Sequence, residues 1–189
     1  MILDSFVWKS ELNKDLRIVK RRLQKAKFSD EPKKYEIATI SIEKFSFTSA
    51  FIIRKLVESK KLSDEFESAS VQMQSFQRIN QENTIHLFNR HRIDEFYDLD
   101  NSSKISLSVV NICNAFIHSF VFEIALSDDE DSFGGIIFNS DKTKNTAVFF
   151  IQLEDYFKVI ESAIKDDIVE MHVQLKEGKI RKSRKRLKT

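Results

Sequence analysis

The stretch Ile105–Leu126, with the sequence ISLSVVNICNAFIHSFVFEIAL, decides the predicted fold class. Its first part repeats apolar residues at helical spacing, which predicts a helix from about Lys104 to His118. From Phe120 onward the residues are aromatic, β-branched and aliphatic, which is typical of a strand. Because a helix and a strand follow each other directly, the sequence indicates an α+β fold.

Helices are predicted for most of the remaining chain. Asp4 is a suitable N-cap for an amphipathic helix that extends to about Lys27, and Pro32 suits the first turn of a second helix that extends to about Ser59. The second helix is apolar almost all round, which places it at the centre of the protein. A last helix is expected over residues 154–176. The chain has only three Gly and one Pro, which leaves little turn chemistry for many strands, so helices should dominate.

Three strands are predicted in the C-terminal half, over residues 120–126, 135–138 and 147–151, and polar connectors join them into an antiparallel meander. Val71–Gln74 and Thr84–Leu87 alternate apolar and polar residues and are expected to form an additional hairpin. The predicted architecture is therefore an apolar helical bundle of about four main helices with a small antiparallel β-meander and this hairpin.

The composition limits the class of protein. Hydrophobic residues make up 41% and charged residues 32% of the chain, which is the balance of a globular protein. The N-terminal residues lack the features of a secretion signal, no apolar stretch approaches the ~20 residues of a membrane-spanning helix, and Cys113 has no second cysteine to pair with. These features predict one cytoplasmic domain over residues 1–176 with no membrane segment. The sequence has no glycine-rich phosphate loop and no zinc-ligand spacing, so neither a cofactor nor a metal is expected.

The C-terminal residues are strongly basic. From Lys176 to Thr189 eight Lys and Arg residues face Glu177 alone, and a flexible basic tail is expected over residues 177–189. Its cations either bind the phosphates of RNA or DNA or only keep the chain in solution. No aromatic residue stands among them, so base stacking is not expected there. The candidate nucleic-acid-binding residues are Lys179, Arg181, Lys182, Arg184, Lys185 and Arg186.

Three polar side chains gather on one side of the helix expected over residues 104–118. Asn111, Asn114 and His118 lie roughly opposite its apolar sector. Where such groups are covered they need hydrogen-bond partners, and most covered polar groups do no more than satisfy neighbouring backbone. The cluster is therefore either structural or a functional site.

The segment Cys113–His118, with the sequence CNAFIH, resembles the signature of the HEPN superfamily. These helical domains are common in bacterial toxins, anti-phage systems and RNA-processing factors. In that family an Arg, often followed by Asn, Asp or His, precedes a His, and the pair cleaves RNA across a dimer interface. Asn114 and His118 match the polar position and the histidine, whereas Cys113 stands at the position of the Arg.

The cysteine at the position of the Arg affects which reaction the site could catalyse. Metal-independent RNA cleavage needs a His to move a proton and a cation to stabilise charge on the phosphate. Cysteine supplies no cation, so Arg54 on the second helix is the candidate substitute, unless it is only paired with Glu43. The resemblance implies an RNA-associated or defence-related binding protein with impaired or unconventional nuclease activity.

Two other functions stay open. One is an active metal-independent endoribonuclease that uses His118 as acid or base, Asn114 as orienter and Arg54 as phosphate partner, across a homodimer. The other is a non-enzymatic module that binds a protein partner.

A second likeness covers more of the chain. The triplets Glu43-Lys44-Phe45 and Arg54-Lys55-Leu56, together with an Asn-x-x-x-His-Ser pattern at residues 114–119, are similar to a pattern in uncharacterised bacterial proteins. This likeness indicates relatives without indicating an activity.

Overall fold

The structure is a computed structural model that describes residues 4–26, 32–79, 82–127, 132–176 and 179–186. The helices are α1 (Ser5–Leu23), α2 (Pro32–Glu58), α3 (Asp64–Ser68), α4 (Ile93–Phe96), α5 (Val109–Ile117) and α6 (Leu153–Lys165). The strands are β1 (Ser70–Arg78), β2 (Tyr97–Ser108), β3 (Ser119–Leu126), β4 (Phe133–Ser140), β5 (Ala147–Gln152), β6 (Ile168–Lys176) and β7 (Lys179–Arg186).

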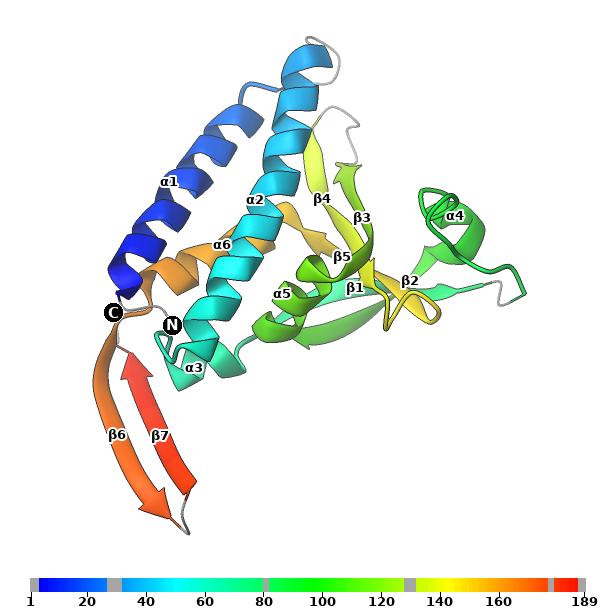
Figure 1. Cartoon of the computed structure of the whole chain (residues 1–189). Coiled ribbons are helices and arrows are strands. Elements are labelled where there is room, and N and C mark those ends of the chain that lie inside the picture. Colours follow the sequence, from blue (N-terminus) through cyan, green and yellow to red (C-terminus); the bar gives the residue numbers. More distant parts are fainter. Residues whose placement is uncertain (1–3, 27–31, 80–81, 128–131, 177–178, 187–189) are drawn as a thin grey trace.

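The centre of the fold is a five-stranded antiparallel sheet in the order β2-β1-β5-β4-β3. Helices α2, α5 and α6 pack on one face of this sheet, and α1 lies outside them against α2 and α6 (Figure 1). The mixture of helices and antiparallel strands is as expected, but the predicted helical bundle is wrong. The helices pack on one another and, as one layer, on a five-stranded sheet, and the expected meander β3-β4-β5 is only part of that sheet.

The helix expected over residues 104–118 is much shorter than predicted. Residues Lys104–Ser108 belong to β2, where Ile105 pairs with Met73 and Leu107 pairs with Val71. Helix α5 begins only at Val109, because the Ser108 side chain caps it by accepting from the Asn111 main-chain N–H at 3.2 Å.

The additional hairpin is also wrong in its pairing. Val71–Gln74 does lie in a strand, β1, but its partners are β2 and β5. Thr84–Leu87 forms no strand and belongs to a lobe between β1 and β2, which projects from the sheet in Figure 1.

The two faces of the sheet carry two hydrophobic cores. The larger core lies under the helices and includes Phe116, Phe138 and Phe149. The smaller one lies on the opposite face, because Val148 and Phe150 alternate with the residues of the larger core along β5. The lobe between β1 and β2 covers this second core.

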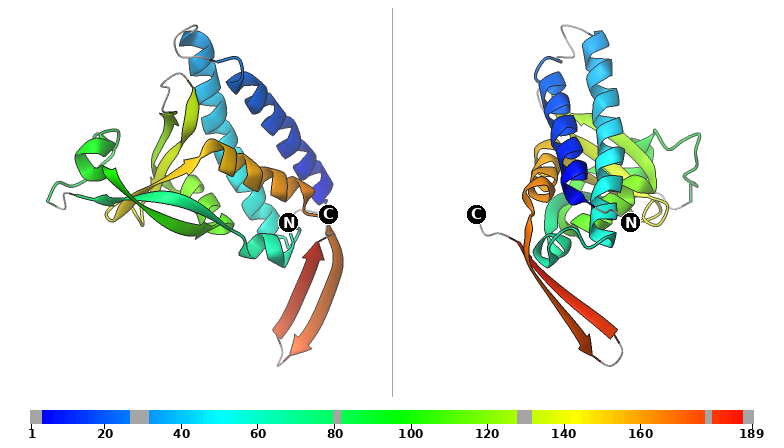
Figure 2. Two further views of the ribbon diagram at one scale, coloured as in Figure 1. Left: turned by 180° about the vertical axis from the view of Figure 1, so that it is seen from behind. Right: turned by 60° about the vertical axis from the view of Figure 1, so that its left-hand side comes forward.

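The C-terminal part departs most from the prediction. Helix α6 ends at Lys165, and β6 and β7 pair as an antiparallel ribbon that projects from the body (Figures 1 and 2). The expected boundary between residues 176 and 177 therefore falls inside this ribbon, and Lys179–Arg186 is a strand instead of part of a tail. Met171, Val173 and Leu175 alternate with polar residues, which is the period of a strand. Among the described residues, no helix has the length and apolar character needed to cross a membrane.

Candidate functional site

Helix α5 presents the polar cluster that the sequence singles out. Ile112, Cys113 and Phe116 are buried in the main core, whereas Asn111 and His118 are exposed and Asn114 is half-buried. The amphipathic spacing of α5 therefore anchors one face and leaves the polar face open to solvent.

These side chains line an open cleft of about 580 Å³ between α5 and the turn that joins β4 to β5. Arg54 from α2 contributes to the same cleft, and Leu107, Ala115 and Phe149 provide its apolar lining. The structure thus brings together Arg54, Asn111, Asn114 and His118, which are the expected site residues of α2 and α5. A cleft of this size is in the range that holds small ligands or single groups of larger ones.

Arg54 is positioned by two hydrogen bonds. Its Nη1 donates to Asn114 Oδ1, and its Nε donates to Glu58 Oε1 at 2.8 Å. The expected pairing with Glu43 is wrong, because Glu43 lies 11 positions away on α2, or about 16 Å along the helix axis. A guanidinium has about five N–H donors, so donors remain for a ligand.

Glu58, the partner of Arg54, also pairs with a second cation. Its other carboxylate oxygen accepts from Lys55 Nζ at 2.7 Å. Hydrogen bonds from Lys55 and, second, from Arg54 lower the pKa of Glu58. One carboxylate thus serves two neighbouring cations, of which Arg54 lines the cleft and Lys55 does not.

The His118 ring is open to solvent. Its main-chain N–H caps α5 by donating to the Asn114 carbonyl at 3.0 Å. Among the described residues, no hydrogen bond or ion pair involves the ring nitrogens of His118. The ring can therefore donate to or accept from a ligand, but no neighbour fixes its tautomer.

Cys113 takes no part in the cleft. Its side chain is 1% exposed and faces the main core. Burial raises the pKa of the thiol to about 12, so Cys113 stays neutral. The position that carries Arg in the HEPN signature is thus turned away from the polar face, and Arg54 is the cation that contacts Asn114.

The turn between β4 and β5 adds a cation that sequence reasoning missed. Lys142 is exposed and lines the cleft, while its neighbour Asp141 is held by Lys144 Nζ at 2.8 Å. In the sequence this segment shows only turn-forming residues, and no local spacing places it beside α5. The pairing of β3 with β4, in which Ser119 lies opposite Ser140, brings the turn beside the end of α5.

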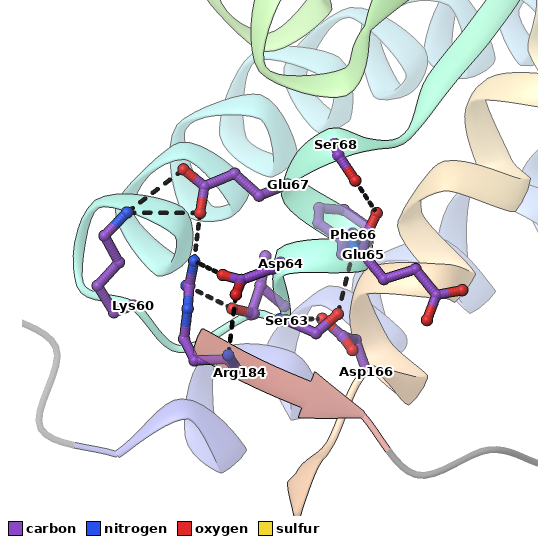
Figure 3. A network of polar contacts seen from close by, with 10 residues as sticks. Lys60, Ser63, Asp64, Glu65, Phe66, Glu67, Ser68, Asp166 and Arg184 are labelled. Atoms are coloured by element: carbon purple, nitrogen blue, oxygen red, sulfur yellow. Dashed lines mark hydrogen bonds and ion pairs between the residues drawn. The ribbon is translucent and has the colours of Figure 1, made fainter. Parts of the chain in front are cut away.

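Three of the candidate nucleic-acid-binding residues at the C-terminus are paired with acids of the same chain. Arg184 is buried between Asp64 and Glu67 of α3, and Arg186 Nη2 donates to Glu65 Oε1 at 2.6 Å. Figure 3 shows the Arg184 side chain beside Asp64 and Glu67. Lys185 pairs with a carboxylate oxygen of Glu170 at 3.1 Å. These three cations are therefore engaged within the chain, and the side chains of Lys179, Arg181 and Lys182 lie outside the described part of the structure.

Within the described ranges, no group of three or more His, Cys, Asp or Glu residues is arranged to hold a metal ion. Comparison of the chain with protein-family models, curated proteins and solved structures found no match. The geometry of the cleft is therefore the basis for the proposals below.

Proposed function

We propose that this chain binds RNA through the cleft beside α5, with a phosphate group held by Arg54 and Lys142. The observation that carries the proposal is the Arg54–Asn114 hydrogen bond, which holds a guanidinium from α2 on the polar face of α5, in the cleft that His118 also lines. A planar guanidinium matches the oxygens of a phosphate better than any other side chain. The HEPN-like signature of α5 favours RNA among phosphate-bearing ligands, although the fold is not a helical bundle.

The charges around the cleft support an anionic ligand. Arg54 and Lys142 are the cations of the lining, and the amides of Asn111 and Asn114 add neutral donors. Asp141 also belongs to the lining, and its carboxylate is paired with Lys144 Nζ at 2.8 Å. The apolar lining below these groups suits a ribose or the face of a base.

The first test compares Arg54→Met with Lys55→Met. Both changes remove one positive charge and one partner of Glu58, but only Arg54 lines the cleft. We expect Arg54→Met to weaken binding of a fluorescently labelled single-stranded RNA about tenfold or more, because hydrogen bonds to a charged group are lost. Lys55→Met should change the affinity by about twofold at most at physiological salt. Equal losses in the two variants, measured by anisotropy, would show that the cleft is not the binding site.

Metal-independent cleavage is a second candidate function, favoured by the exposed His118 ring in the same cleft as Arg54. In such a reaction the ribose 2′-oxygen attacks the phosphorus and loses its proton. The bond to the 5′-oxygen breaks, that oxygen takes up a proton, and a 2′,3′-cyclic phosphate forms. His118 could transfer one of these protons and Arg54 could stabilise the charge on the phosphate. The absence of a hydrogen-bonded orienter on the described His118 ring predicts slow turnover.

His118→Ala tests this second candidate. With EDTA present, we expect the rate of RNA cleavage to fall about 100-fold or more, because a positioned proton donor or acceptor is lost. RNA affinity should change little in the same variant. The 2′,3′-cyclic end is detected by mass spectrometry, and an RNA with one 2′-deoxyribose at the cleavage position should resist. Unchanged cleavage by His118→Ala would remove His118 from the mechanism and leave binding as the function of the cleft.

A further inference from the structure

The lobe between β1 and β2 exposes large apolar side chains. Phe88 is 87% exposed, and its neighbour Leu87 is 66% exposed. Ile79, at the start of the lobe, is 59% exposed. Scattered exposed apolar residues are ordinary, but an aromatic ring held this far into solvent next to other apolar groups marks an interaction surface.

The lobe holds Phe88 in a defined place. Asn89 closes the turn around it, since its Oδ1 accepts from the His86 main-chain N–H at 2.7 Å and its Nδ2 donates to the Thr84 carbonyl at 3.1 Å. The Phe88 main-chain N–H donates to His86 Nδ1 at 3.2 Å. Ile85 is buried in the second core directly before this turn. The ring is thus presented by an ordered turn, which lowers the entropic cost of binding.

The lobe also meets the end of the α5 cleft. Arg90 Nη1 donates to the Phe120 carbonyl at 3.1 Å, and Phe120 follows His118 by two residues. The Lys144 ammonium lies over the Phe120 ring at 4.0 Å from the ring centroid, and Lys144 belongs to the turn that lines the cleft. The lobe covers the second core and the cleft lies on the helix face, but both are at the same end of the sheet. The turn between β4 and β5 joins them, because it lines the cleft and its Lys144 carbonyl accepts from the Tyr97 hydroxyl at the end of the lobe at 2.6 Å.

The charges of the lobe indicate what kind of contact it makes. Arg90 and Arg92 are exposed, but Arg92 pairs with Glu95 at 3.4 Å. Glu123 of β3 lies close to Arg90 and His91, and partial burial raises its pKa. Cations and acids therefore nearly balance, and the lobe is a weak phosphate site. What it offers a ligand is the face of Phe88, which suits an unpaired nucleobase.

We propose that Phe88 is a base-stacking platform that extends the α5 cleft, so that the preferred ligand is single-stranded RNA long enough to reach both. This inference rests on the proposed function, because the cleft holds the phosphate end of the ligand. A duplex keeps its bases stacked inside and offers no free base to Phe88. The sequence signal for it is the run 86–92, in which Phe88 is flanked by His86 on one side and by Arg90, His91 and Arg92 on the other.

The test measures the affinity of Phe88→Ala for three labelled ligands, which are a trinucleotide, a single-stranded RNA of about twelve nucleotides and a duplex of equal length. Stacking on an aromatic residue is worth about tenfold in affinity per base. We expect that loss for the longer single strand alone, with unchanged binding of the trinucleotide and the duplex. Phe88→Trp should retain the affinity, and Leu87→Ala is the matched control that removes an exposed apolar side chain without removing a ring.

The outcomes separate this inference from the proposed function. If Arg54→Met weakens binding while Phe88→Ala binds the long single strand like the parent, the stacking platform is refuted and the cleft stands. The lobe is then a surface for a protein partner. If Leu87→Ala weakens binding as much as Phe88→Ala, general apolar contact replaces stacking and the inference is also refuted. If Phe88→Ala weakens binding while Arg54→Met and Lys55→Met do not differ, Phe88 contacts the RNA outside the cleft, and both the cleft proposal and the extension of the cleft to Phe88 are refuted.

Discussion

Replacing Phe116 by Ala is expected to lower the free energy of unfolding by about 4 kcal/mol. The Phe116 side chain is fully buried, and its ring contacts the rings of Phe138 at 4.8 Å, Tyr156 at 5.0 Å and Phe122 at 5.3 Å between centroids. These partners come from β4, α6 and β3, so this one side chain of α5 joins two strands and a second helix. Truncation to Ala removes the ring and leaves a cavity that close-packed neighbours cannot fill.

Urea denaturation followed by far-UV circular dichroism measures this loss. The matched control is Phe51→Ala on α2, which removes the same ring from a side chain that is 49% exposed. We expect the control to cost less than about 1 kcal/mol, as surface changes usually do. If both variants lose the same stability, Phe116 does not anchor α5 as described.

The stability of α5 bears directly on the cleft. The helix has only nine residues, too few to persist in water without tertiary packing. Its polar face therefore keeps its position only because Ile112, Cys113 and Phe116 are buried on the other side. This is why a change in the core is expected to disturb Asn114 and His118 without touching either of them.

The sequence identifies the local features of the candidate site well. Helical spacing places Asn111, Asn114 and His118 on one side of α5, and Arg54 stands out as a charge on an apolar helix. The structure brings Arg54 to Asn114 in one open cleft. Their role in binding or catalysis stays a prediction that the RNA experiments test.

Strand pairings between residues that are far apart in the chain are harder to predict from the sequence. The pairing of Ser70 with Ser108 joins residues on either side of the lobe, and no local period encodes it. Residues 168–176 are ambiguous for another reason. Ile168, Met171 and Leu175 fit the spacing of a helix, whereas Met171, Val173 and Leu175 fit the spacing of a strand. In the structure α6 ends before Asp166, and the segment that follows is a strand. The contacts of β7 with α3 resolve the ambiguity in the folded chain.

The contacts between β7 and α3 centre on Arg184. They lead to a prediction about how the C-terminal ribbon is attached to the body. The Arg184 side chain is 3% exposed, and its guanidinium bonds to Asp64 Oδ1, to Glu67 Oε2 and, at 2.5 Å, to the Leu62 carbonyl (Figure 3). The Arg184 main-chain N–H also donates to Asp64 Oδ2 at 2.9 Å. A two-stranded ribbon has little stability alone, so this network is what fixes the ribbon to the body.

Removing the two acids should cost more than removing the Arg. In Asp64→Asn with Glu67→Gln the guanidinium stays buried without a countercharge, and we expect a loss of about 3 kcal/mol. In Arg184→Met the carboxylates are 44% and 33% exposed and regain water, so the loss should be about half as large. Hydrogen exchange of the β7 main-chain amides measures the release of the ribbon. Arg186→Met is the matched control, since its partner Glu65 is 62% exposed and the pair should contribute less than about 1 kcal/mol.

The pH dependence separates this electrostatic attachment from simple packing. Burial alone would raise the pKa of Asp64 and of Glu67, but the hydrogen bonds and charge of Arg184, together with those of Lys60, outweigh it and lower both pKa values. A carboxyl group with a lowered pKa in the folded state stabilises that state at pH values above its unfolded pKa of about 4. This stabilisation disappears as the pH falls through the lower folded pKa. Protection of β7 should therefore decline below about pH 4 more steeply in the parent than in the doubly substituted protein, which keeps only the Lys185–Glu170 and Arg186–Glu65 pairs of the ribbon. Equal profiles would mean that the charges of Asp64 and Glu67 do not hold the ribbon.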